Sequence, residues 1–177
     1  PTDYNGWSPL NADRKWHGDM PLYQALANSY NIPAINTFKS IGIKTGIEKG
    51  KQFGLNLTSK NDNLTTALGA GVGTNPWQMA QAYATFANDG IMNDAHLIKK
   101  IVNASGQTIA TAKVKSKRVI DSNTAQKMTS MMLGTYTNGT GIYAAPYGYT
   151  LAGKTGTNED IDQWVIGYTP DVDRKSV

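Results

Sequence analysis

The sequence predicts a mixed fold of the α/β (α+β) class, in which helices flank an antiparallel sheet. Helical periodicity with capping residues recurs between residues 19 and 134. Two strand-like segments near the end, 150–157 and 163–168, are joined by the short polar stretch Asn158-Glu159-Asp160, which suggests an antiparallel pair. The 177 residues contain no internal repeat. We therefore expect one domain over 1–177, incomplete at both ends because the chain starts at Pro1 and stops abruptly.

Five segments carry helix signals, namely a capping side chain or an early proline followed by apolar residues at helical spacing. They are 19–28, 33–42, 45–54, 76–88 and 122–134. The capping residues are predicted to be Asp19, Thr45 (in a capping box with Glu48), Thr74 or Asn75, and Ser122, while Pro33 opens the second helix. Ser29 and Asn31 then fall on a short connection between the first two helices, which presents polar groups well.

Four segments are predicted as strands. Residues 97–103 and 107–113 form a hairpin across Ala104-Ser105-Gly106, since Ile and Val partly alternate with polar residues there. After a glycine-rich, aromatic loop over 135–149, the pair 150–157 and 163–168 follows.

The composition excludes several classes of function. The formal net charge is +4, and the one basic cluster, Lys113 to Arg118, is more typical of a solvated strand or loop face than of a nucleic-acid site. Cysteine is absent, which rules out disulfides and thiol catalysis. His17 and His96 lack the spacing of a zinc site. No apolar run approaches the roughly 18 residues that span a membrane. We expect no cofactor, no nucleic-acid partner and no membrane contact by this chain.

The stretch Leu151 to Thr157 admits two interpretations. Residues 148–155 match the phosphate-loop pattern G-x-x-x-x-G-K-[ST], while Lys154-Thr155-Gly156 matches the lysine-threonine-glycine motif of penicillin-recognising serine enzymes. A phosphate loop needs a buried strand before it and a helix after its lysine, and the sequence offers neither. A second Lys-Thr-Gly at Lys44 reads as a helix start, so the tripeptide alone is weak evidence. The glycines at 69, 71 and 73 do not follow the dinucleotide spacing either.

In the serine-enzyme interpretation, residues 154–157 are a strand at the edge of a cleft. Lys154 supplies positive potential, the hydroxyls of Thr155 and Thr157 bind a carboxylate, and Gly156 leaves room for a substrate backbone. The Thr157 amide is directed at a developing oxyanion. Ser29 and Asn31 supply the hydroxyl and the amide that such a site needs on its facing wall.

These motifs and several longer strings resemble the transpeptidase domain of class A penicillin-binding proteins. Ser29-Tyr30-Asn31 matches the second active-site motif of that family, S-x-N, and Lys154-Thr155-Gly156 matches the third. The longer strings that resemble it lie at 6–9, 25–29, 78–87, 152–157 and 162–170. The resemblance implies the fold shared by penicillin-recognising serine transpeptidases and β-lactamases. It also implies acyl transfer from the D-Ala-D-Ala end of peptidoglycan stem peptides, and acylation by β-lactam antibiotics.

The resemblance assigns roles to the matching residues. Ser29 and Lys154 are catalytic, Ser29 as a proton relay, and Asn31 with Thr155, Gly156 and Thr157 binds substrate. The family nucleophile lies in S-x-x-K, yet no serine of this chain is followed by lysine three residues later. We expect this motif in the remainder of the same polypeptide, anchored at the extracytoplasmic face of a bacterial membrane. A β-lactamase or a penicillin-sensing receptor of the same fold is the alternative.

Overall fold

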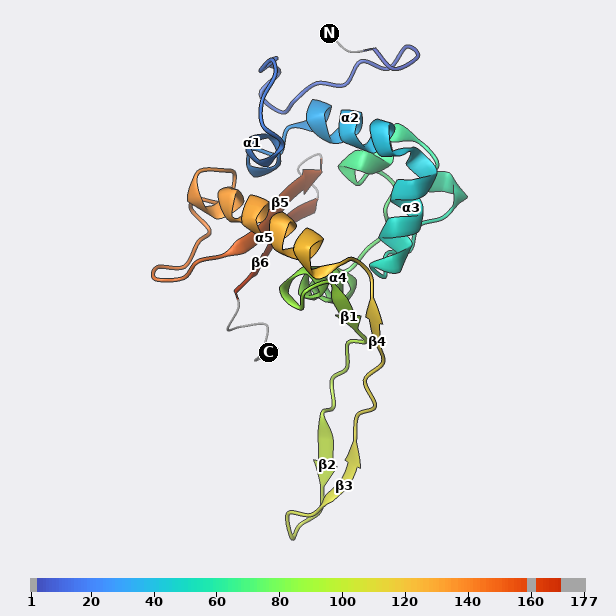
Figure 1. The fold of residues 1–177 in the computed structure, drawn as a ribbon, viewed down its shortest axis with the longest axis vertical. Helices are drawn as coiled ribbons and strands as arrows, with labels where there is room; N and C mark the ends of the chain where they lie inside the picture. Colours follow the sequence, from blue (N-terminus) through green and yellow to red (C-terminus); the bar gives the residue numbers. More distant parts are fainter. Residues whose placement is uncertain (1–2, 159–161, 170–177) are drawn as a thin grey trace.

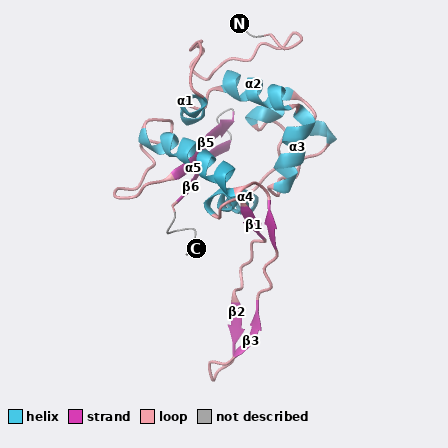
Figure 2. Ribbon diagram, viewed as in Figure 1, coloured by secondary structure: helices cyan, strands magenta, loops and turns pink. Residues whose placement is uncertain are grey.

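The computed structural model describes residues 3–158 and 162–169. Helices α1, α2 and α3 lie in the part of the molecule near the N-terminus, and α5 crosses the strands β5 and β6 (Figure 1). A slender hairpin projects from the rest of the molecule (Figure 1). Within the described residues all strand pairing is antiparallel (Figure 2). The predicted combination of helices with antiparallel strands is therefore confirmed.

The first three helices follow one another closely. They are α1 (Leu22–Ala27), α2 (Asn31–Ile41) and α3 (Ile43–Gln52). Asp19 does not cap α1, whose N-cap is Pro21 without a side-chain bond. Helix α2 begins at Asn31 and not at Pro33, because the first turn of a helix needs no internal N–H bonds and so tolerates a proline. The predicted capping box at Thr45 is also wrong, since α3 starts directly after Gly42.

The middle of the chain contains two short 3₁₀ turns, Ser59–Asn61 and Leu64–Leu68, and then helix α4 (Pro76–Ala87). Of the two predicted caps for α4, Asn75 is the one used: its side chain accepts a hydrogen bond from the Gln78 backbone N–H at 3.0 Å. Phe86 stacks on Phe53, with ring centroids 4.9 Å apart, and joins α4 to the end of α3.

Helix α5 (Ser122–Thr137) is longer than the sequence predicts. Its N-cap is Asp121, whose carboxylate accepts the Thr124 N–H at 2.8 Å, and not Ser122. The helix also continues through Gly134, where we expected it to stop. A Cβ at Gly134 would lie 3.0 Å from the Cβ of Ala27, so this glycine serves the close crossing of α1 over α5.

The projecting hairpin contains two separate ladders. The predicted pairing of its outer part is confirmed by β2 (Lys100–Val102) and β3 (Thr108–Thr111), both shorter than expected. The ladder at its base, β1 (Ile91–Asn93) with β4 (Ser116–Arg118), was not predicted, because three-residue strands carry too little alternation. Lys117 and Arg118 are exposed on β4, as expected for a solvated strand face.

Strands β5 (Ala152–Asn158) and β6 (Asp162–Tyr168) form the pair that carries the predicted site motif. Their register joins Ala152 to Tyr168 and Asn158 to Asp162, which confirms the predicted antiparallel pair. Residues 159 and 160 of the predicted turn lie outside the described residues. Helix α5 packs on this pair, with Met132, Ala152 and Tyr168 buried together at the contact.

At Gly153 the paired strand leaves no room for a side chain. A Cβ at this position would lie 1.9 Å from the backbone oxygen of Ile166 on the paired strand. We expect Gly153→Ala to lower the free energy of unfolding of the full-length polypeptide by about 1–3 kcal/mol, measured by denaturant titration. Gly73→Ala is the matched control, because a Cβ at Gly73 meets no atom within 4 Å. Equal stability of the two variants would contradict this packing argument.

Candidate functional site

Ser29 occupies a backbone position that usually belongs to glycine. Its φ angle is +56°. The Ser29 N–H donates to the Leu26 carbonyl at 3.1 Å and the Tyr30 N–H to the Ala25 carbonyl at 3.0 Å, which are the paired bonds of a Schellman motif at the end of α1. A serine in left-handed geometry is strained, and such strain concentrates at functional sites. The motif turns the chain so that α2 begins two residues later.

Asn31 is the first residue of α2, and the N-terminal segment holds it in place. Its side-chain nitrogen Nδ2 donates to the Leu10 carbonyl at 2.7 Å, while Asn11 Oδ1 accepts the Ile32 N–H at 3.2 Å. These bonds fix the orientation of the Asn31 amide. Within the described residues the Asn31 Oδ1 receives no hydrogen bond, so it is available to accept an N–H from a ligand.

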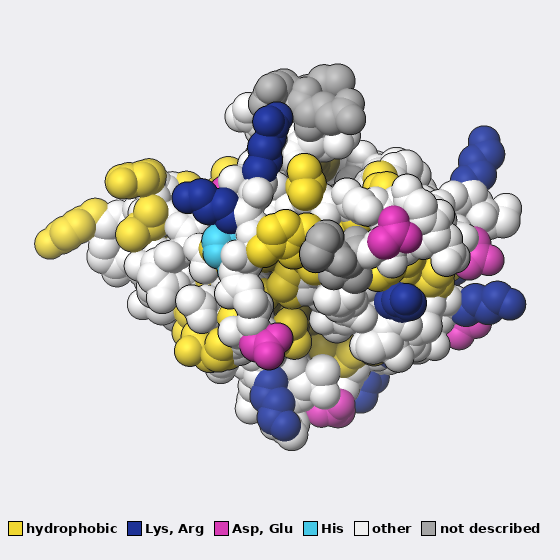
Figure 3. Space-filling view, turned by 90° about the horizontal axis from the view of Figure 1, so that it is seen from above, with side chains coloured by type: hydrophobic (Ala, Val, Ile, Leu, Met, Phe, Trp, Pro, Cys, Tyr) yellow, Lys and Arg dark blue, Asp and Glu magenta, His cyan; other side chains and the backbone are white. Residues whose placement is uncertain are grey.

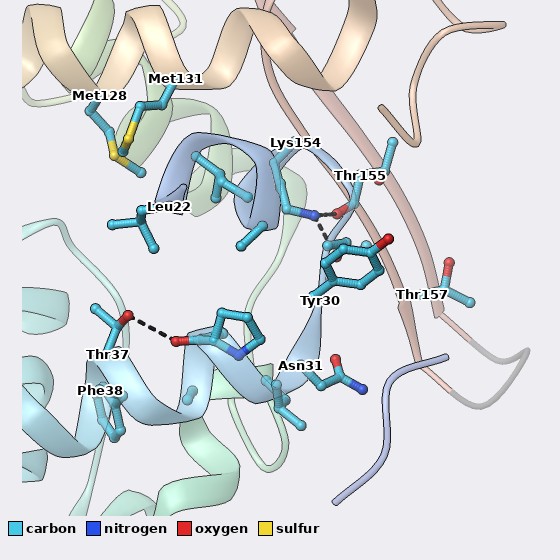
Figure 4. Close-up of a pocket in the computed structure, with 18 of the residues that line it drawn as sticks. Leu22, Tyr30, Asn31, Thr37, Phe38, Met128, Met131, Lys154, Thr155 and Thr157 are labelled. Carbon is cyan, nitrogen blue, oxygen red and sulfur yellow. Dashed lines mark hydrogen bonds between the residues drawn. The ribbon is translucent and has the colours of Figure 1, made fainter. Parts of the chain in front are cut away.

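Lys154, in the first half of β5, reaches Ser29 from a position 125 residues away in sequence. Its Nζ donates to Ser29 Oγ at 2.6 Å and to the Thr155 carbonyl at 2.8 Å. Figure 4 shows the lysine side chain extending from the strand toward the start of α2, near Tyr30 and Asn31. The structure thus brings the two predicted motifs into direct contact.

The surroundings of Lys154 are poorly solvated. Desolvation by burial lowers the pKa of Lys154 from 10.5 to about 8. Burial also raises the pKa of Tyr83, which lines a cavity with Lys154, to about 12, with smaller contributions from Tyr168 and Tyr136. Lys154 is therefore mostly charged at pH 7 but loses its proton in the mildly alkaline range, which an exposed lysine does not.

Both motifs line a cavity of about 530 Å³. Ser29 and Asn31 lie on one wall and residues 154–157 on the other, with Thr157 exposed at the rim (Figure 4). The remaining lining is mostly apolar and comes from α1, α2 and α5: Leu22, Leu26, Pro33, Phe38, Met128 and Met131. A cleft with an apolar lining and a few convergent polar groups is the usual form of a small-ligand site.

A second cavity of about 350 Å³ adjoins Lys154 on the side facing α4. Its lining is almost entirely apolar: Leu26, Phe53, Met79, Tyr83, Phe86 and Met132. Lys154 therefore lines both the cleft and this apolar hollow.

The structure agrees with the rejection of a phosphate loop at residues 148–155. Lys154 is the third residue of β5, and β6 pairs with that strand along its length. A phosphate loop would instead place this lysine at the N-terminus of a helix. The local arrangement is that of a strand facing a cleft.

The comparisons with known proteins agree with this arrangement. Residues 1–177 match the family model described as the penicillin binding protein transpeptidase domain. The chain belongs to this family. It is 56% identical over 161 residues to penicillin-binding protein 2a of Streptococcus pneumoniae, a match that covers 87% of this chain and 22% of that protein. The chain thus spans about a fifth of the length of this curated relative.

Solved structures resemble this chain over most of its length. The D,D-transpeptidase domain of a peptidoglycan glycosyltransferase from Eggerthella lenta gives a TM-score of 0.80 at 24% identity, covering 97% of this chain and 50% of that one. Penicillin binding protein 3 from Mycobacterium tuberculosis, complexed with ampicillin, gives 0.75 at 26% identity, covering 89% and 40%. These likenesses confirm the predicted fold.

Thr140 is a residue of the site region that the sequence did not reveal. Its hydroxyl forms a hydrogen bond with the hydroxyl of Thr155, although Thr140 lies in the loop that follows α5. Its only sequence signal is its place between two glycines, Gly139 and Gly141, within a loop that we had treated as a whole.

Part of the molecular surface is formed by exposed apolar side chains. On the face seen in Figure 3, basic and acidic side chains are interspersed with apolar ones and form no patch of one sign. Among the described residues, none of the helices is both long and apolar enough to cross a membrane.

The strain at Ser29 yields a prediction about stability. We expect Ser29→Gly to raise the free energy of unfolding of the full-length polypeptide by about 1 kcal/mol, because glycine adopts the left-handed conformation without a Cβ penalty. Ser29→Ala is the control, since it removes the same hydroxyl but keeps the Cβ. Denaturant titration of both variants decides the matter: if alanine stabilises as much as glycine, backbone strain is not the cause.

Proposed function

We propose that this chain forms part of a peptidoglycan D,D-transpeptidase domain within a longer polypeptide. The observation that carries the proposal is the 2.6 Å bond between Lys154 Nζ and Ser29 Oγ, which joins the S-x-N and Lys-Thr-Gly motifs beside the cleft. Family membership supports the same activity. The substrates are stem peptides ending in D-Ala-D-Ala, and β-lactams act as their mimics. The active domain lies on the extracytoplasmic side of the membrane, anchored by a segment outside this chain.

The proposed reaction is acyl transfer in two steps. A serine hydroxyl attacks the carbonyl of the penultimate D-alanine, an ester bond forms, and the peptide bond to the last D-alanine breaks. Ser29 passes a proton toward the departing D-alanine amine. An amine of a neighbouring strand then attacks the ester carbonyl. The amide cross-link forms, the ester bond breaks, and a proton from the attacking amine goes to the serine oxygen, which restores the hydroxyl.

Each site residue has a role consistent with its geometry. Asn31 accepts the peptide N–H with its Oδ1, since its Nδ2 is bound to Leu10. Lys154 supplies positive potential in a poorly solvated setting, where a charge acts strongly. Thr155 and Thr157 donate to the terminal carboxylate, and Gly156 leaves space above the strand. The Thr157 amide faces the developing oxyanion.

The nucleophile is supplied by another part of the polypeptide. No serine in this chain has the S-x-x-K spacing. An apolar helix that carries this motif could pack in the apolar hollow of about 350 Å³, because this hollow adjoins Lys154. On this proposal residues 1–177 are one partial transpeptidase domain.

Covalent labelling with a fluorescent penicillin tests the proposed function. We expect the full-length polypeptide to be labelled and residues 1–177 alone to remain unlabelled. In the full-length polypeptide, Lys154→Ala and Ser29→Gly should each slow acylation by about two orders of magnitude, since one preorganised donor is worth about 2.7–4 kcal/mol in the transition state. Lys44→Ala is the matched control, because it alters the other Lys-Thr-Gly, in α3. Wild-type rates in the site variants would refute the site assignment.

The lifetime of the adduct separates this proposal from a β-lactamase. A lactamase needs a base that activates water for deacylation. The chain has only two glutamates: Glu48 lies in α3, and Glu159 lies outside the described residues. A long-lived acyl-enzyme is the expected result, whereas rapid turnover of penicillin would favour the lactamase alternative.

The pKa of Lys154 predicts a pH dependence of acylation. A lysine is cationic below its pKa, so the charge that binds the carboxylate disappears as the pH rises through about 8. We expect the second-order acylation rate constant to fall about tenfold between pH 7 and pH 9. In Lys154→Arg the charge persists, so that variant should be slower but independent of pH over this range. Identical pH profiles for the two proteins would contradict the role of this charge.

A further inference from the structure

The loop after α5 touches both walls of the cleft through one residue. The backbone N–H of Thr140 donates to the Ala27 carbonyl at 3.0 Å, two residues before Ser29. The Thr140 hydroxyl meets the hydroxyl of Thr155 on β5. Thr140 thus links the end of α1 to the strand that carries Lys154.

This contact is held by the surrounding backbone. A Cβ at Gly139 would lie 2.2 Å from the Ala27 oxygen, so the loop presses directly on the end of α1. On the other side, the Gly141 N–H donates to the Thr135 carbonyl at 2.8 Å. Gly139 and Gly141 therefore hold the backbone of Thr140 in place on both sides. This backbone position directs the Thr140 side chain toward Thr155.

The hydrogen bond between the hydroxyls of Thr140 and Thr155 limits how Thr155 can bind a carboxylate. A hydroxyl carries one proton and two acceptor sites, and a carboxylate accepts hydrogen bonds only. Thr155 can donate to a carboxylate only if its proton is not spent on Thr140. This condition holds when Thr140 is the donor and Thr155 Oγ1 the acceptor, because the Thr155 proton then points away from Thr140.

We infer that Thr140 is a positioning residue that directs the Thr155 proton toward the substrate carboxylate. The inference rests on the proposed function and adds a determinant of its specificity for ligands with a free carboxylate. A hydrogen bond to a charged acceptor is stronger than one between neutral groups, so a misdirected proton weakens binding of the anion in particular. A ligand without that charge gains little from the arrangement.

The test compares benzylpenicillin with its methyl ester on the full-length polypeptide. For Thr140→Val we expect the ratio of acylation rate constants, acid over ester, to fall about ten- to hundredfold relative to wild type. The loss should appear in the dissociation constant of the non-covalent complex, with the first-order acylation step within about threefold of wild type. Thr140→Ser retains the hydroxyl and should restore the ratio to within about threefold.

Thr137→Val is the matched control. It removes a hydroxyl from the end of α5 that bonds the Leu133 carbonyl and lies outside the site, so the ratio should not change. If thermal unfolding shows that Thr140→Val does not fold, Thr140→Ala carries the same prediction with a smaller side chain.

The following outcomes would overturn the inference. A wild-type ratio in a folded Thr140→Val refutes it. An equal loss for acid and ester, or a loss confined to the first-order step, shows that Thr140 only supports the fold. In both cases the proposed function survives, because wild type is still acylated. If wild type is not acylated by benzylpenicillin, the proposed function fails and this inference fails with it.

Discussion

The packing of helix α5 against two partners at once is the constraint on which the site depends. On one side Gly134 lets α1 approach closely, and on the other the helix covers the β5–β6 pair, where Tyr136 donates to the Ile166 carbonyl at 2.6 Å. Because Ser29 lies in the turn directly after α1 and Lys154 lies on β5, the packing of α5 on both elements sets the distance between the two motifs. A shift of α5 would separate Ser29 from Lys154 without altering either local structure.

The burial that stabilises this arrangement also determines the chemistry of the site. The contact of α5 with β5 removes water from around Lys154, and this desolvation lowers the lysine pKa to about 8. Desolvation likewise strengthens the attraction of the remaining charge for an anion. The backbone of the site is also strained, because Ser29 adopts a left-handed conformation that glycine would adopt with less strain. On the proposed function, the Ser29 hydroxyl is retained at the expense of some stability, a trade-off that is common at functional sites.

Several elements could be predicted from local patterns because their causes are local. The Asn75 cap with Pro76 and the stop at Gly42 are set by neighbouring residues, and the structure agrees. The errors were of two kinds. In some a neighbouring residue took the predicted role, as Asp121 caps α5 in place of Ser122, and in others a distant partner decided. Gly134 is an example of the second kind, since this glycine allows the close approach of α1 and does not end the helix.

The sequence by itself determined the family, through long strings that match it and two short motifs whose residue types suit an anionic ligand. It also showed that S-x-x-K is absent from these 177 residues. Only the tertiary structure decided that Ser29 and Lys154 touch, that the lysine loses its proton at mildly alkaline pH, and that Thr140 reaches Thr155. The physical reason is that hydrogen bonds and burial between segments far apart in sequence depend on how α1, α5 and β5 pack, and no local pattern encodes that packing.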